Sequence, residues 1–159
     1  MIIVSNTSPI NYLILIGQID LLPELFRQVI IPQAVYSELS DTEAPNLVRT
    51  WITTPPNWLK IQPQPVSQAS DTIINLLDPG ERAAILLAQE LKANLLLLDD
   101  MKARRTAIDR GLSITGILGI LDQAATLKLI DLPLAVQSLQ ATSFWASDSL
   151  FQRLLDKHT

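Results

Sequence analysis

Short runs of consecutive apolar residues alternate along the chain with segments that carry apolar residues at helical spacing. The apolar runs predict strands at residues 2–5, 28–31, 95–98 and 112–115. A proline-rich, irregular stretch over residues 53–68 contains a further short edge strand at 59–62. Because the strands are apolar throughout instead of alternating, we expect an α/β fold with a parallel sheet that helices cover on both faces.

The helices between these strands are predicted from caps and periodicity. Ser8 is expected to be the N-cap of the first helix, with Pro9 at the first helical position, which leaves Asn6 free at the end of the first strand. Gly17 closes that helix. Further helices are predicted over residues 19–26, from Pro32 onward, over 71–77, 79–92 and 100–110, and after 115.

Length and composition indicate one domain over residues 1–159. A chain of 159 residues buries roughly 70% of its unfolded surface, which is enough for a single core. Charged residues make up only 18% of the chain against a usual share of about 25%, so a partner chain is plausible. The absence of cysteine excludes disulfides and thiolate chemistry, and no apolar run approaches the roughly 18 residues of a membrane span. We expect a cytoplasmic protein without a membrane segment.

The net charge of −4 argues against a protein that binds nucleic acid through electrostatics alone, because such proteins carry a strong basic excess. A local basic patch is still present, since Lys102, Arg104, Arg105 and Arg110 lie within nine residues. These side chains are either phosphate contacts or the solvated face of a helix.

Acidic side chains follow the predicted strands. Asp99 and Asp100 come directly after the strand at 95–98, and ligands of parallel α/β sheets bind outside the carboxyl ends of the strands. If this strand neighbours the first one, Asn6 faces the same crevice. Asp99 is alternatively the N-cap of the helix that follows.

Two further carboxylates are placed by helical spacing. Glu81 lies on the apolar face of its helix, but Asp78 and Glu81 also have the spacing of a capping box. Glu38 lies one to two turns into the helix that begins near Pro32, where it either points into the crevice or lies on the surface.

Four segments resemble, in order and spacing, the PIN domain, the metal-dependent ribonuclease fold of VapC-type toxins and related nucleases. They are I-I-V-S-N-T-S-P-I at 2–10, I-I-P-Q-A-V-Y-S-E-L at 30–39, P-G-E-R-A-A-I-L-L-A at 79–88 and L-L-L-L-D-D-M-K-A-R at 95–104. The resemblance implies a three-layer α/β/α sandwich with a central, mostly parallel twisted sheet of about five strands. It also implies a cytoplasmic protein with an RNA substrate, a small antitoxin partner and a homodimeric state.

The resemblance also implies the site residues. Glu38, Glu81 and Asp100 match the metal-binding acids of the family, with Asp99 as an additional acid. The family usually has Asp at the end of the first strand, where this chain has Asn6. Many members also have an acid beyond the fourth strand, and that acid has no clear match near residues 113–115.

The expected chemistry follows from the oxygen ligands. Clustered carboxylates repel one another, so a divalent cation is the natural counter-charge, and ligands that are all oxygen suit Mg²⁺ or Mn²⁺. A metal ion there would activate water for hydrolysis of RNA phosphodiester bonds. In this hypothesis Asn6 and Asp100 are inner ligands, and Glu38 and Glu81 hold the metal or its waters.

The remaining residues have outer roles in the same hypothesis. Asp99 is an outer carboxylate or a cap, Arg104 contacts the scissile phosphate, and Lys102 and Ser8 are further substrate contacts. His158, one residue from the end of the sequence, is expected to be mobile and receives no role.

Three other functions compete with the nuclease. The chain is alternatively a catalytically weakened PIN-like protein that binds RNA or a partner, a phospho-receiver, or a purely structural module. The phospho-receiver fits worse. That family has its acidic pair after the first strand, an acceptor Asp after the third and a Lys after the fifth, and none of these is matched here. The absence of G-x-G-x-x-G and of a P-loop disfavours dinucleotide and nucleotide-triphosphate enzymes.

Overall fold

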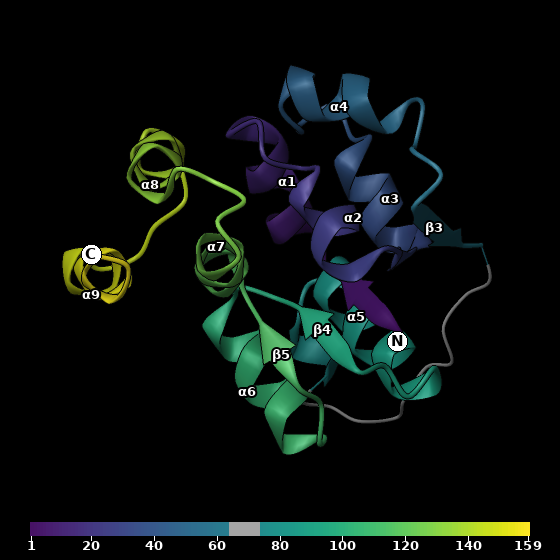
Figure 1. Cartoon of the computed structure of the whole chain (residues 1–159). Helices are drawn as coiled ribbons and strands as arrows, with labels where there is room; N and C mark the ends of the chain where they lie inside the picture. Colours follow the sequence, from purple (N-terminus) through teal and green to yellow (C-terminus); the bar gives the residue numbers. More distant parts are fainter. Residues whose placement is uncertain (64–73) are drawn as a thin grey trace.

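The structure is a computed structural model that describes residues 1–63 and 74–159. Within these residues five parallel strands form one sheet in the order β3-β2-β1-β4-β5 (Figure 1). The strands are β1 (Ile3–Ser5), β2 (Val29–Pro32), β3 (Leu59–Gln62), β4 (Leu95–Leu97) and β5 (Ile114–Thr115). The predicted parallel sheet is confirmed, including the short edge strand at Leu59–Gln62.

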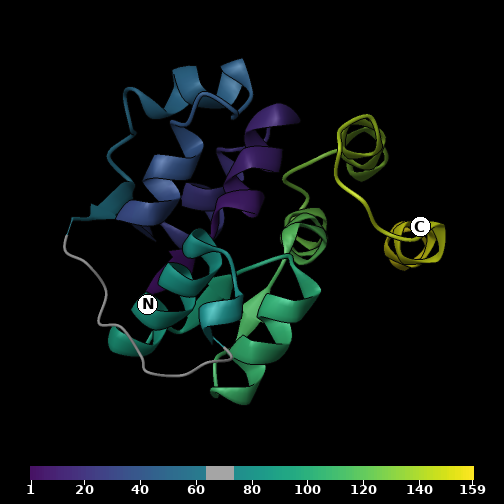
Figure 2. The same cartoon turned by 180° about the vertical axis from the view of Figure 1, so that it is seen from behind.

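Helices cover both faces of the sheet, as the apolar strands require (Figures 1 and 2). One face packs against α5 (Pro79–Glu90), α6 (Met101–Asp109) and the 3₁₀ turn η1 (Ile74–Leu76). The other core contains residues of α1 (Thr7–Leu15), α2 (Leu21–Phe26), α3 (Gln33–Leu39), α4 (Asn46–Ile52), α7 (Ile117–Thr126), α8 (Leu132–Gln140) and α9 (Asp148–Lys157). The fold is therefore a three-layer α/β/α sandwich.

The alternation of side chains along each strand explains why the central strands β1 and β4 are almost entirely apolar. Val4 and Leu96 belong to the core under α5 and α6, whereas their neighbours Ile3 and Leu97 belong to the core on the opposite face. Successive side chains of a strand point to opposite faces, so a strand that is covered twice needs apolar residues at every position.

The pairing of β1 with β4 positions the candidate site. The two strands run parallel, with Ser5 opposite Leu97, and the Asn6 amide donates to the Leu97 carbonyl at 2.9 Å. The chain winds from β1 outward to β3 in one direction and through β4 to β5 in the other, so β1 and β4 flank the reversal point. Parallel sheets bind ligands at this point, outside the carboxyl ends of the strands.

The C-terminal helices lie beyond α7, away from the sheet (Figures 1 and 2). The Asp122 carboxylate in α7 accepts from Lys157 Nζ at 2.8 Å, and it lies 2.7 Å from His158 Nε2. The Phe144 ring lies 5.3 Å from that of Tyr12 in α1. The prediction that His158 is mobile is wrong, because its side chain is held against α7.

Several predicted helix boundaries also need correction. Asn6, not Ser8, is the N-cap of α1, because its backbone is extended while Thr7 is already helical, so Pro9 is the third helical residue. Pro32 is the last residue of β2 and the N-cap of α3, not its first residue. Residues 71–73 of the helix predicted at 71–77 lie outside the described residues, and Ile74–Leu76 forms a 3₁₀ turn.

No helix within residues 1–63 and 74–159 combines the length and the apolar character that crossing a bilayer requires.

The burial of β4 leads to a stability prediction. Leu97 is fully buried in the centre of the sheet, so Leu97→Ala is expected to lower the free energy of unfolding by about 2–5 kcal/mol. Leu134 in α8 is 59% exposed, so Leu134→Ala is the matched control and should change it by less than about 0.5 kcal/mol. Urea denaturation measures both values, and equal effects would contradict the assignment of Leu97 to the core.

Candidate functional site

Four predicted site residues surround the carboxyl edge of β1 and β4. Asn6 directly follows β1, Glu38 lies in the last turn of α3, Glu81 in the first turn of α5, and Asp100 is the N-cap of α6. The Glu81 carboxylate interacts electrostatically with both Asp100 and Glu38. Residues from distant parts of the sequence therefore meet at one edge of the sheet.

The Glu38 carboxylate joins three helices. It accepts from the Thr7 hydroxyl at 2.5 Å and from the Gly80 amide at 3.1 Å, which links α3 to the beginnings of α1 and α5. A Cβ atom at Gly80 would collide with this carboxylate, so any other residue there would displace the Glu38 side chain from this position. Thr7 and Gly80 are not among the site residues predicted from the sequence, although both lie within the segments at 2–10 and 79–88 that resemble the PIN domain.

Glu81 belongs both to the capping box and to the acidic edge. Its amide donates to Asp78 Oδ1 at 2.9 Å, and the Asp78 amide donates to Glu81 Oε1 at 3.4 Å, so the predicted capping box is present. The pKa of the same carboxyl is raised to about 7, first by burial and then by the charges of Asp78 and Asp100. The two interpretations of Glu81 are therefore compatible.

Burial also raises the pKa of Glu38, and the charge of Asp78 adds to that effect, whereas the hydrogen bonds from Thr7 and Gly80 oppose it. Two carboxyls at this edge thus resist ionisation for the same reasons, namely partial burial and neighbouring negative charge. Protonation of either carboxyl, or binding of a cation at the edge, would reduce the cost of burying these negative charges next to one another.

The two adjacent aspartates have different surroundings. The Asp100 carboxylate accepts from the Ala103 amide at 2.9 Å and so caps α6. The Asp99 carboxylate instead accepts from the Ile117 amide of α7 at 2.9 Å. The prediction that Asp99 caps the helix after it is wrong, because Asp100 does so and Asp99 reaches a helix 18 residues further along.

The four residues of the predicted basic patch have different surroundings in the fold. Arg104 donates to the Leu98 carbonyl at 3.1 Å and lies beside Asp99, so its guanidinium is used within the protein. Arg110 donates to Gln89 at 2.7 Å. Lys102 and Arg105 have exposed side chains on α6, next to Asp100, and Ser8 is half-buried in α1.

The side-chain oxygens at this edge match the metal hypothesis in type but not in number. Asn6 is 4% exposed, and its buried Oδ1 atom has no hydrogen-bond partner among the described residues. A buried amide oxygen without a partner is destabilising unless another group occupies it, and it is a suitable ligand for a hard cation. Within residues 1–63 and 74–159, however, no three His, Cys, Asp or Glu side chains are spaced to hold one ion. The donor types fit Mg²⁺ or Mn²⁺, but the described side chains do not form a complete ligand set.

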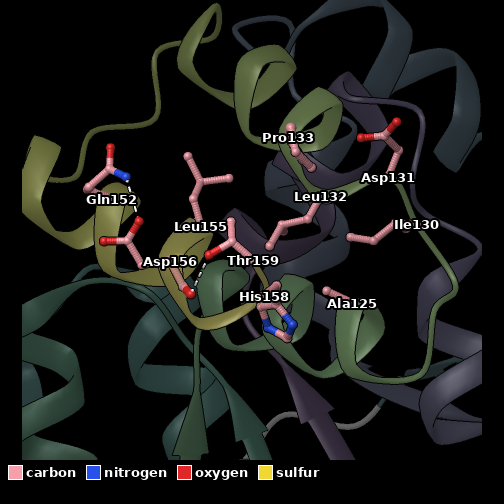
Figure 3. Close-up of a pocket in the computed structure, with 10 residues that line it drawn as sticks. All are labelled: Ala125, Ile130, Asp131, Leu132, Pro133, Gln152, Leu155, Asp156, His158 and Thr159. Carbon is pink, nitrogen blue, oxygen red and sulfur yellow. Dashed lines mark hydrogen bonds between the residues drawn. The ribbon is translucent and has the colours of Figure 1, made fainter.

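Two hollows lie in the described surface. A pocket of about 280 Å³ opens beside Glu38 and is lined by residues of α1, α3 and the following loop, among them Thr7, Asn11 and Asp41. A larger pocket of about 530 Å³ lies between the C-terminal end of α9 and the segment that joins α7 to α8 (Figure 3). None of the predicted site residues lines this larger pocket.

Comparison with known protein families gives a match over nearly the whole sequence. A profile described as PIN domain matches residues 2–159. No curated protein and no solved structure gives a significant match. Because the profile spans nearly the whole sequence and the sheet has the expected parallel architecture, this chain belongs to the PIN domain family.

Proposed function

We propose that the protein is a ribonuclease that depends on Mg²⁺ or Mn²⁺ and acts at the carboxyl edge of β1 and β4. The observation that carries this proposal is the convergence of Glu38, Glu81 and Asp100 on the edge where the buried Asn6 Oδ1 has no partner among the described residues. Membership of the PIN domain family, which has a nuclease-type fold, supports the same reaction class.

Each residue has a role that its position supports. Asn6 and Asp100 would hold the metal directly, while Glu38 and Glu81 would hold it or its bound waters. A bound divalent cation would lower the pKa of water and offset charge on the phosphodiester. The amide and hydroxyl donors that hold Glu38, Glu81 and Asp100 in place leave other carboxylate lone pairs available, since an ionised carboxylate accepts about four hydrogen bonds.

The exposed cations of α6 would orient the RNA. Lys102 lies in the first turn of α6, next to Asp100, and Arg105 lies about one turn further along; both are exposed and would contact phosphates of the RNA. Arg105 replaces Arg104 in this role, because the Arg104 guanidinium is bound to the Leu98 carbonyl and lies beside Asp99.

A second candidate function is RNA or partner binding without cleavage. It is favoured by Asn6, which supplies one negative charge fewer than the aspartate that the resemblance leads us to expect. The toxin role, the antitoxin and the homodimer remain predictions.

Asp100→Asn separates the metal role of this residue from its capping role. Asparagine caps a helix about as well as aspartate, so the metal-free variant should unfold at nearly the parent temperature. Loss of the charge should weaken Mn²⁺ binding roughly tenfold to a hundredfold or more and should abolish RNA cleavage. The measurements are thermal unfolding with Mn²⁺ titration and cleavage of a mixed single-stranded RNA pool.

Asp131→Asn is the matched control, because Asp131 caps α8 in the same way but is not one of the site residues. The parent and this control should both gain about 2.7 kcal/mol at a hundredfold excess of Mn²⁺ over Kd. If Asp100→Asn responds like the control, Asp100 is not a ligand. If the parent does not respond to millimolar Mn²⁺, the metal-dependent nuclease is excluded.

Asn6→Asp should have opposite effects with and without metal. A carboxylate at this buried position adds negative charge to the edge, so the metal-free variant should unfold at a lower temperature than the parent. Mn²⁺ should bind more tightly than in the parent and should restore the unfolding temperature. Unchanged Mn²⁺ affinity, measured by calorimetric titration, would contradict the placement of Asn6 in the site.

The raised pKa of Glu81 predicts a pH dependence of stability. Its pKa is about 7 in the folded protein and lower in the unfolded chain, so between these values the unfolded state releases a proton that the folded state keeps. The free energy of unfolding of the metal-free protein should therefore fall as pH rises from about 4.5 to about 7 and then level off with respect to this group.

Glu81→Gln tests that pH dependence, because glutamine also completes a capping box. The variant should lose the Glu81 contribution to the slope in urea denaturation at a series of pH values. Mn²⁺ competes with the proton, so parent affinity for Mn²⁺ should rise over the same range. An unchanged slope in Glu81→Gln would show that other groups cause it.

A further inference from the structure

Asp99 is a mostly buried carboxylate that the proposed chemistry does not use. Its Oδ1 atom accepts from the Ile117 amide at 2.9 Å, while its Oδ2 atom is buried without a hydrogen-bond partner among the described residues. Ile117 is the first residue of α7, and the N-cap residue of that helix is Gly116, which has no side chain. Asp99 therefore supplies the side-chain cap that α7 cannot supply itself.

The packing around this cap is tight. A Cβ atom at Gly116 would overlap the Asp99 carboxylate and would lie 2.8 Å from Arg104 Nη1. The same Nη1 atom donates to the Leu98 carbonyl at 3.1 Å. Asp99, Arg104, Gly116 and Ile117 thus connect the end of β4, α6 and the beginning of α7, and we call these four residues the Asp99 bracket.

The bracket and the acidic edge lie on different sides of the backbone. Adjacent side chains of an extended segment point in opposite directions, and Asp100 has extended backbone angles. The Asp99 carboxylate interacts with Ile117 and Arg104, whereas Asp100 interacts with Glu81. When Asp99 is held toward α7, its neighbour Asp100 is directed toward α5.

The bracket also fixes the base of the C-terminal helices. Ile117, Ile120 and Leu121 of α7 are fully buried in the core, and α7 carries α8 and α9. Because these side chains anchor α7 in the core, a hydrogen bond to the beginning of α7 ties the end of β4 to the core as well.

We propose that Asp99 is a positioning residue that holds Asp100 at the acidic edge by capping α7, and that it binds neither metal nor RNA. The part of this inference that concerns the metal rests on the proposed function. The cap requires only a hydrogen-bond acceptor at residue 99, whereas a carboxylate ligand would hold the metal more weakly after losing its negative charge.

The test compares Asp99→Asn, Asp99→Ala and the double variant D99A/G116S in the full chain. Removal of the acceptor in Asp99→Ala should speed hydrogen exchange of the Ile117 and Ala103 amides by roughly threefold to thirtyfold, as expected for a lost cap. Asp99→Asn keeps the acceptor and should keep both amides protected.

The double variant provides the sharpest comparison. Serine at 116 would collide with the Asp99 carboxylate in the parent, so Gly116→Ser alone should lower the unfolding temperature. In the Asp99→Ala background the collision with the carboxylate is gone and only the flexible end of Arg104 has to shift. Serine can then cap α7, so the same substitution should raise the unfolding temperature and restore amide protection. Asp131→Ala, which removes the cap of α8, should leave the Ile117 and Ala103 amides unchanged.

Mn²⁺ titration distinguishes positioning from ligation. We expect Asp99→Asn to bind Mn²⁺ within about threefold of the parent, Asp99→Ala to bind it more weakly, and D99A/G116S to recover affinity. The inference is overturned if Asp99→Asn loses Mn²⁺ binding as completely as Asp100→Asn, or if Asp99→Ala leaves the exchange of the Ile117 and Ala103 amides unchanged. If the parent binds no Mn²⁺, the proposed function fails. The positioning role is then decided by amide exchange and by whether Gly116→Ser lowers the unfolding temperature in the parent but raises it in the Asp99→Ala background.

Discussion

The parallel pairing of β1 with β4 is the constraint on which the rest of the structure depends. Ser5 lies opposite Leu97, and the Asn6 amide continues the ladder to the Leu97 carbonyl. Both strands are covered on both faces, so apart from the buried Ser5 at the end of β1 they carry only apolar side chains. Because parallel strands end at the same edge, the first polar residues after each strand lie close together.

Helix capping holds the acidic edge together despite its charge. Glu81 completes the capping box of α5, Asp100 caps α6, and Glu38 accepts from the Gly80 amide near the beginning of α5. Carboxylates are stabilised at helix N-termini by free amides and by the positive end of the helix dipole. The pKa values of Glu38 and Glu81 are nevertheless raised, first by burial and then by the charges of neighbouring acids such as Asp78. The hydrogen bonds to helix N-termini thus hold these acids in place, while their negative charges remain without a counter-charge among the described residues. A bound cation would supply that counter-charge.

Adjacent aspartates illustrate how neighbours in sequence acquire separate functions. Asp100 is exposed at the edge and joins the acidic group, whereas Asp99 is mostly buried and caps α7. The difference arises from the alternating direction of side chains in an extended segment and from the absence of a capping side chain at Gly116. A similar connection from the middle of α7, between Asp122 and His158, holds the C-terminal helix.

Features that depend on neighbouring residues could be predicted from the sequence. The apolar runs determined the strands and their parallel arrangement, and the spacing of Asp78 and Glu81 determined the capping box, because both signals are local. The tertiary structure alone decided that Thr7 holds Glu38, that Asp99 caps α7 and that Arg104 is used internally, over separations of 31, 18 and 6 residues. Hydrogen bonds of this kind leave no periodic pattern, because their partners meet only after the sheet has brought separate elements together.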